Sequence, residues 1–313
     1  MKYLTVILSM SFLVICNCSS LKTYPQEKEK FTKKFKEFTF VENCQEDTLL
    51  KEIHNDLKDK KTILDLLKFY SDELVKNPDI NSPYFKKLQK IFECGLTPQS
   101  MQGYYHGAVI AFRNEALLKT LDINTLNLKW PLLRFFSPWT GKTFEKIDKE
   151  KLIAITDGFI TDEKEIAWGS NTYTTRSAQK MISVELMKFI GINLVKAEPE
   201  EIETHNYNMK GFFFIGKAGK SVNPNNKGKI VYQINYRWPA LHTFPPDNYC
   251  IDELVQVANG LYLGQLLYAT NLRLNYNPNL DPKIYQYKNF GFWLLMDEDW
   301  QKRRKEIRFD LIY

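Results

Sequence analysis

The hydrophobic positions of this chain change their spacing about one third of the way along it. Between Cys44 and Gly95 apolar residues recur every three or four positions, a spacing typical of amphipathic helices. The last of these stripes follows Asn81-Ser82-Pro83, a capping residue and an early proline, and it ends at Gly95. We therefore expect two or three short helices over residues 44–98.

From Gly103 onward the hydrophobic spacing is two, the period of a strand that buries one face. One helical pattern, Arg176 to Ile190, interrupts the later apolar segments, and turn-forming residues separate the rest. The predicted strands cover residues 103–112, 152–156, 201–205, 211–215, 230–236, 251–257, 261–270 and 290–295. Hairpin-length gaps without a βαβ rhythm indicate an antiparallel barrel. The predicted fold is α+β, with a short N-terminal helical segment followed by a β-barrel domain over residues 99–313 that contains one inserted helix.

Composition agrees with a folded, globular protein. The chain has 313 residues, of which 44% are hydrophobic, so a sizeable core can form without covalent staples. Its net charge of +6 is too small for a dedicated nucleic-acid-binding protein, and we expect no nucleic-acid partner. Five cysteines are too few for a disulfide scaffold. Nothing in the sequence indicates an oligomeric state.

The first residues have the order of an export signal. Lys2 precedes an apolar run that is too short to span a bilayer and that ends in Cys16-Asn17-Cys18. This order resembles the signal of a bacterial lipoprotein with a loose, spirochaete-type lipobox. The resemblance implies removal of residues 1–17 and acylation of Cys18, with Cys16 as the alternative because the bulkier Ile15 precedes it. It also implies a membrane partner through a lipid anchor and a place in the bacterial cell envelope, on the outer rather than the inner membrane. An ordinary secretory signal or a short uncleaved anchor is the alternative interpretation.

Residues 18–43 are rich in lysine and are interpreted as a tether between the anchor and the fold. Phe31, Phe35 and Phe38 have helical spacing, so an amphipathic surface helix is the alternative. An exported protein can keep disulfides. Cys44 and Cys94 flank the helical segment, and we expect them to pair and to leave Cys250 free.

Two segments imitate a phosphate-binding loop, and both are rejected. Gly141-Lys142-Thr143 and Gly219-Lys220-Ser221 each lack the glycine that the motif needs five residues earlier. The four histidines lie far apart and form no recognised metal motif, so we expect no metal site.

One set of residues could act as an acid–base pair although it matches no known catalytic motif. His106 would need an orienting carboxylate, which Asp252 or Glu253 could supply if their strand lay nearby. Adjacent residues of a strand face opposite sides, so only one of the two acids can point into a barrel. A half-exposed histidine with no catalytic role is the simpler interpretation, and we assign no catalytic residue.

The segment Gly103-Tyr104-Tyr105-His106-Gly107 is similar to the Gly-x-Trp-x-Gly signature of lipocalin-like barrels, with Tyr105 in place of the tryptophan. Gly260–Gly264 and Phe290–Trp293 are similar in character to later strands of such barrels. The resemblance implies a small apolar ligand in the barrel and no obligatory cofactor. The aromatic residues that we expect to contact it are Tyr105, Trp139, Tyr262 and Trp293; alternatively, they fill a solid core.

Three hypotheses for the function follow. The first is a lipid-anchored envelope protein whose barrel binds a small hydrophobic or amphipathic ligand. The second is a lyase or hydrolase that uses His106 with Asp252 or Glu253. The third is a structural or adhesion lipoprotein with a solid barrel. Strand alternation separates the first two, because Tyr105 inward favours ligand binding and His106 inward favours catalysis.

Overall fold

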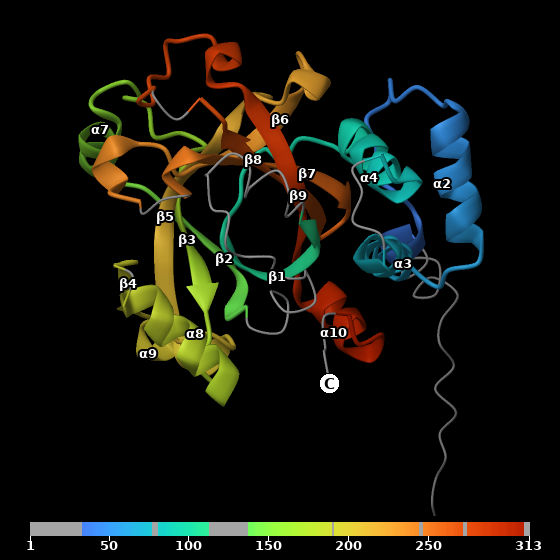
Figure 1. Cartoon of the computed structure of the whole chain (residues 1–313), viewed down its shortest axis with the longest axis horizontal. Coiled ribbons are helices and arrows are strands. Elements are labelled where there is room, and N and C mark those ends of the chain that lie inside the picture. The colour runs from blue at the N-terminus through green and yellow to red at the C-terminus, as the bar shows by residue number, and fades with distance from the viewer. Residues whose placement is uncertain are drawn as a thin grey trace, which may run out of the picture.

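In this computed structural model the centre of the molecule is a closed antiparallel β-barrel of eight strands. Figure 1 shows how the strands are arranged around it. The structure describes residues 33–76, 81–112, 137–189, 191–243, 247–271 and 274–309. The strands follow one another around the barrel in the order β3-β2-β1-β9-β8-β7-β6-β5, and pairing of β3 with β5 closes it. The strand bounds are β1 (Gly103–Phe112), β2 (Trp139–Lys146), β3 (Ala167–Tyr173), β5 (Met209–Lys220), β6 (Ile230–Asn235), β7 (Cys250–Ala258), β8 (Leu261–Ala269) and β9 (Tyr287–Met296). A short additional strand, β4 (Leu194–Lys196), pairs with the start of β5. The predicted α+β class and antiparallel barrel are confirmed.

Three helices pack on one outer side of the barrel: α2 (Thr48–Lys58), α3 (Ile63–Lys76) and α4 (Pro83–Cys94) (Figure 1). The α4 helix begins and ends where its sequence predicts. The Ser82 side chain accepts a hydrogen bond from the Tyr84 amide, Pro83 occupies the first turn, and Gly95 follows the last one. The helical segment shares a single apolar core with the outer faces of β1, β7, β8 and β9, so it is not a separate folding unit.

The remaining α-helices are α7 (Lys149–Thr156), α8 (Ala178–Phe189), α9 (Pro199–Thr204) and α10 (Glu298–Glu306). Single 3-10 turns form η1 (Pro224–Asn226), η2 (Pro239–Leu241), η3 (Asp247–Tyr249) and η4 (Pro282–Tyr285). The helix predicted from Arg176 is α8. It buries only Val184 and leaves a set of large apolar side chains exposed: Met181, Ile182, Leu186 and Phe189.

Two predicted strands are helices, so the expectation of one inserted helix is wrong. Residues 152–156 lie in α7, where Leu152 and Thr156 are buried one helical turn apart. Residues 201–205 overlap α9, which begins at Pro199 and whose Glu201 carboxylate accepts a hydrogen bond from the Glu198 amide at 2.8 Å. Such short segments have no clear period. A capping box favours the helix in α9, whereas the Asp148 side chain makes no capping hydrogen bond to α7.

The segment assigned to the tether folds against the barrel before residue 43. The Phe35 side chain is buried, and its ring centroid lies 4.6 Å from that of Trp300. The Thr39 amide donates a hydrogen bond of 2.8 Å to the carbonyl oxygen of Val257. Lys34 forms ion pairs with Asp297 and Asp299. The boundary at residue 43 is therefore placed too late.

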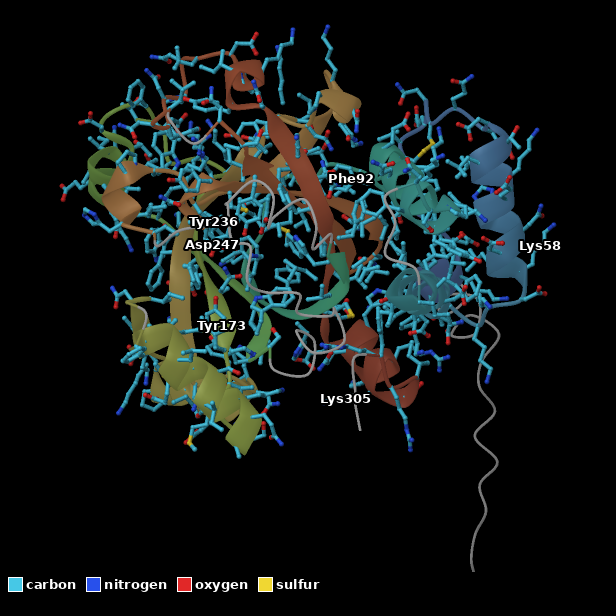
Figure 2. All side chains as sticks on the ribbon, in the orientation of Figure 1. Lys58, Phe92, Tyr173, Tyr236, Asp247 and Lys305 are labelled. Atoms are coloured by element: carbon cyan, nitrogen blue, oxygen red, sulfur yellow. A yellow bond between two sulfur atoms is a disulfide. The ribbon has the colours of Figure 1, made fainter. Side chains whose placement is uncertain are left out.

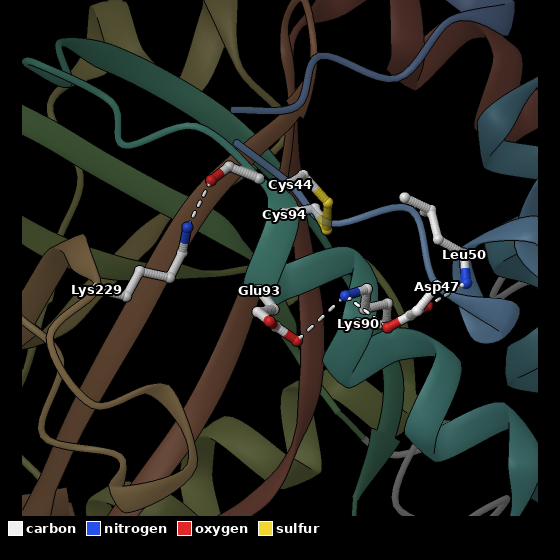
Figure 3. Close-up of a disulfide and its surroundings, with 8 residues drawn as sticks. Cys44, Asp47, Leu50, Lys90, Glu93, Cys94 and Lys229 are labelled. Atoms are coloured by element: carbon white, nitrogen blue, oxygen red, sulfur yellow. Dashed lines mark hydrogen bonds and ion pairs between the residues drawn. A yellow bond between two sulfur atoms is a disulfide. The ribbon is translucent and has the colours of Figure 1, made fainter. Parts of the chain in front are cut away.

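A disulfide joins this N-terminal segment to the end of α4 (Figure 3). Cys44 and Cys94 are bonded, with their Cα atoms 5.2 Å apart. Close to this bond, Lys90 forms an ion pair of 2.9 Å with Asp47, whose carboxylate also caps α2. Cys250 is a free, buried thiol.

The signal peptide (residues 1–17) and the two candidate acylation sites, Cys16 and Cys18, lie outside the described residues. In the part of the chain that the structure describes, no helix has both the length and the apolar character needed to cross a membrane.

Candidate functional site in the barrel interior

A buried polar network occupies the interior of the barrel. Lys142 of β2 and Asp252 of β7 are only 3% and 2% exposed, and their charged groups lie 3.2 Å apart. The Lys142 ammonium group also donates to the Asn171 side-chain oxygen, at 2.7 Å, and to the Tyr236 hydroxyl. Tyr236, which directly follows β6, donates to the Asp252 carboxylate at 3.2 Å. Four segments that are distant in the sequence thus meet around one lysine.

A bulge in β2 places Lys142 inside the barrel. The register of β2 against β3 shifts between Trp139 and Gly141, so that both Trp139 and Lys142 reach the interior. Gly141 has a φ of +154°, and a Cβ there would overlap the carbonyl oxygen of Tyr105. Only glycine permits this close approach of β1 and β2.

The acidic groups in and around this network have raised pKa values, so the structure favours their protonated forms. Burial raises the pKa of Asp252, and the Lys142 ammonium group opposes this shift. Burial of its carboxyl group, together with the nearby Asp252 charge, raises the pKa of Asp247 to about 7, although Asp247 as a whole residue is half-buried (Figure 2). Burial also raises the pKa of the Cys250 thiol, which donates to Asp252 at 3.3 Å. The interior therefore holds a carboxyl group, that of Asp247, that can carry a proton near neutral pH.

Aromatic rings surround the lysine. The Lys142 ammonium nitrogen lies between 4.9 and 5.8 Å from the ring centroids of four residues, which are Trp139, Phe214, Tyr236 and Trp293. Ring faces attract a cation at such distances. Two other polar atoms of the interior, the Trp293 indole nitrogen and the Tyr232 hydroxyl, are buried and have no hydrogen-bond partner within the described part of the chain.

The four predicted ligand-contacting residues belong to one interior apolar cluster. The rings of Trp139 and Trp293 meet edge to face with their centroids 6.1 Å apart, and those of Tyr105 and Tyr262 do so at 5.4 Å. Strand alternation predicted opposite sides for Tyr105 and its neighbour His106. Tyr105 points into the barrel and His106 points outward.

The structure does not bring His106 together with either predicted carboxylate. His106 lies beside α10, and its Nε2 is 2.6 Å from the carboxylate of Glu298. Burial lowers the pKa of His106, and the hydrogen bond to Glu298 opposes this shift. Asp252 faces the interior. Glu253 faces outward and accepts hydrogen bonds from Ser221 at 2.7 Å and from Gln265 at 2.7 Å. The two acids thus face opposite sides, as predicted, but neither is a partner of His106.

Sequence reasoning missed Lys142, Asn171 and Tyr236. The sequence presents Lys142 only as part of Gly141-Lys142-Thr143, a rejected phosphate-loop motif. In the structure this Gly-Lys-Thr segment lies inside strand β2. Gly219-Lys220-Ser221 likewise lies at the end of β5, with a 3-10 turn rather than an α-helix after it. The useful signal was Trp139, which marks β2 as a strand with an aromatic inner face.

Among the residues that the structure describes, no group of three or more His, Cys, Asp and Glu side chains is arranged to hold a metal ion. The chain matches no known protein-family model, no curated protein and no solved structure at a significant level.

Proposed function

We propose that the barrel binds a small hydrophobic or amphipathic molecule in its interior. The apolar part would lie against Trp139 and Trp293, and a polar group would bind beside the Lys142–Asp252 pair. The single observation that carries this proposal is the buried, unpartnered indole nitrogen of Trp293, together with the unpartnered Tyr232 hydroxyl in the same interior cluster.

Unpaired polar groups are costly inside a protein. A buried donor without an acceptor costs about 1–3 kcal/mol, and most such groups in native proteins are paired. Trp293 is 3% exposed and Tyr232 is fully buried, so bulk water does not reach them directly. A ligand oxygen would accept a hydrogen bond from either group and would also gain contact with the surrounding rings.

A fluorescent apolar probe tests the proposal. The neutral naphthalene ketone 6-propionyl-2-(dimethylamino)naphthalene, whose carbonyl oxygen can accept a hydrogen bond, should bind the intact protein saturably, and Trp293→Phe should weaken its binding several-fold. Trp168→Phe is the matched control, because Trp168 stacks on Phe213 in a separate cluster and should leave the affinity unchanged. A flat titration with a correctly folded protein, or equal effects of the two variants, would contradict ligand binding and would favour a solid, structural barrel.

The proposed location is the bacterial cell envelope, with the protein anchored through acylated Cys18. Support comes from the order of charge, apolar run and cysteine in residues 1–20. Cys18→Ala should move the protein from the membrane fraction to the soluble fraction. If only Cys16→Ala does so, the acylated cysteine is Cys16.

The enzyme hypothesis has no comparable support. His106 is bound to Glu298 on the outer face of the barrel, so it is not placed to act with Asp252 on an interior substrate.

A further inference from the structure

A separate cavity lies beside the connection from β6 to β7, and it has a volume of about 270 Å³. This volume is near the lower end of the range for small-molecule sites, so any ligand must be small. Its wall includes aromatic and polar side chains, among them Tyr236, Arg237, Trp238, Thr243, Asn248 and Tyr276.

Arg237 is a buried cation without an acidic partner. It is 4% exposed, and no carboxylate of the described residues lies within ion-pair distance of it. Its guanidinium group donates to the Tyr287 hydroxyl and to the Leu274 carbonyl oxygen at 3.4 Å, and both acceptors are neutral. Its Nε finds no acceptor in the described ranges. Buried charges are normally paired, so this cation leaves an uncompensated positive charge at the cavity wall.

Tyrosine rings hold the guanidinium group in place. Its central carbon lies 4.2 Å from the ring centroid of Tyr285, 5.2 Å from that of Tyr276 and 5.5 Å from that of Tyr287. Ring faces attract a cation, but they do not neutralise it. The rings therefore fix the position of Arg237 without replacing a counter-ion.

Other polar atoms of the same wall also lack partners. The Trp238 indole nitrogen, the Thr243 hydroxyl and the Asn248 side-chain oxygen are buried and have no partner among the residues that the structure describes. The indole and the hydroxyl are hydrogen-bond donors, as is the guanidinium Nε. Oxygen atoms of an anion satisfy such donors, and a guanidinium group matches the planar shape of a carboxylate.

We propose that this cavity binds a small organic carboxylate with a flat, unsaturated body, with the carboxylate bound by Arg237 and the body lying against the aromatic wall that Trp238 and Tyr276 form together, their ring centroids 5.1 Å apart. This inference goes beyond the proposed function and does not depend on what the barrel interior binds. The proposal rests on three features of this one cavity: the positive charge of Arg237, the unpaired hydrogen-bond donors and the aromatic wall.

Benzoate and its neutral isostere benzamide test the proposal on the full chain by titration calorimetry. Benzoate should bind at least tenfold more tightly than benzamide. Arg237→Gln should remove this preference, because the positive charge is lost while the shape of the site is kept. The matched control is Lys217→Gln, since Lys217 lines an adjoining cavity of about 240 Å³ that shares Trp238 and Tyr276. This control should leave benzoate binding unchanged.

If Arg237→Gln does not fold, two further measurements decide. In the native protein, benzoate but not benzamide should shift the Trp238 indole N–H signal in an NMR spectrum. Thr243→Val should weaken benzoate binding several-fold. Equal binding of benzoate and benzamide, or loss of benzoate binding in Lys217→Gln alone, would overturn the assignment to Arg237.

Discussion

At the scale of single residues, the interior depends on one lysine that the strand pattern alone does not identify. Alternation correctly predicts that only one of Asp252 and Glu253 points inward. The same rule cannot place Lys142, because a bulge at Gly141 changes the alternation of β2. Bulges depend on close contacts between strands, here with the carbonyl oxygen of Tyr105, and such contacts are not visible in one sequence.

The buried ion pair between Lys142 and Asp252 should contribute far more to the free energy of unfolding than an ion pair at the surface. Lys142→Met leaves Asp252 buried without its partner and should lower the free energy of unfolding by about 3–5 kcal/mol. The control is Lys68→Met, which breaks an ion pair with Asp72 whose side chains are 30% and 42% exposed. This change should cost about 0.5 kcal/mol or less. Urea denaturation measures both, and similar losses would show that the interior pair is not special.

Asp247 should make the fold less stable as the pH rises. Its pKa is about 7 in the folded protein against an ordinary value of 3.8, so the folded state holds this proton more tightly than the unfolded state. The free energy of unfolding should therefore fall as the pH rises from about 4 through 7. Denaturation at pH 5 and pH 8 should show a smaller fall for Asp247→Asn than for the native protein. The pKa of Asp252 is also raised, so Asp252 lowers the stability of both proteins as the pH rises. An equal fall in the free energy of unfolding of the two proteins would contradict the assignment to Asp247.

At the scale of elements, the sequence predicts best where one face of a strand is uniformly apolar. The predicted strands at 251–257, 261–270 and 290–295 match β7, β8 and β9 because aliphatic residues line their buried outer faces. β2 and β3 were missed, since their outer faces carry polar pairs such as Thr143 with Ser170. These hydroxyls satisfy each other only after the strands have paired.

The disulfide should stabilise the attachment of the N-terminal segment. Cys44 and Cys94 are separated by 50 positions, and closing a loop of that length is worth about 4 kcal/mol in the chain-entropy model. Unfolding in urea with and without dithiothreitol should reveal a loss of this order. A Cys44→Ser/Cys94→Ser double variant is the control, because reduction should not destabilise it further. No effect of reduction on the native protein would mean that the disulfide does not form.

At the scale of the whole molecule, the two faces of the barrel have different roles. The outer face of β1, β7, β8 and β9 packs under α2, α3 and α4 and supplies a conventional apolar core (Figure 1). The inner face combines aromatic rings with charged and polar groups, a combination that a purely structural core does not require. Long-range pairing creates this interior from β2, β3, β7 and the residue after β6. The sequence therefore predicts the aromatic residues and an inward acid, but not the Lys142 that pairs with Asp252.

The most direct test of interior binding is quenching of tryptophan fluorescence by a dibrominated long-chain alcohol, which is neutral and amphipathic. Bromine quenches only those rings that it approaches closely. Of the tryptophans that the structure describes, Trp139 and Trp293 lie in the interior cluster. We predict saturable quenching of the native protein that is mostly lost in a folded Trp139→Phe/Trp293→Phe variant. Quenching that does not saturate, or that persists unchanged in this variant, would contradict the proposal that the barrel interior binds a ligand.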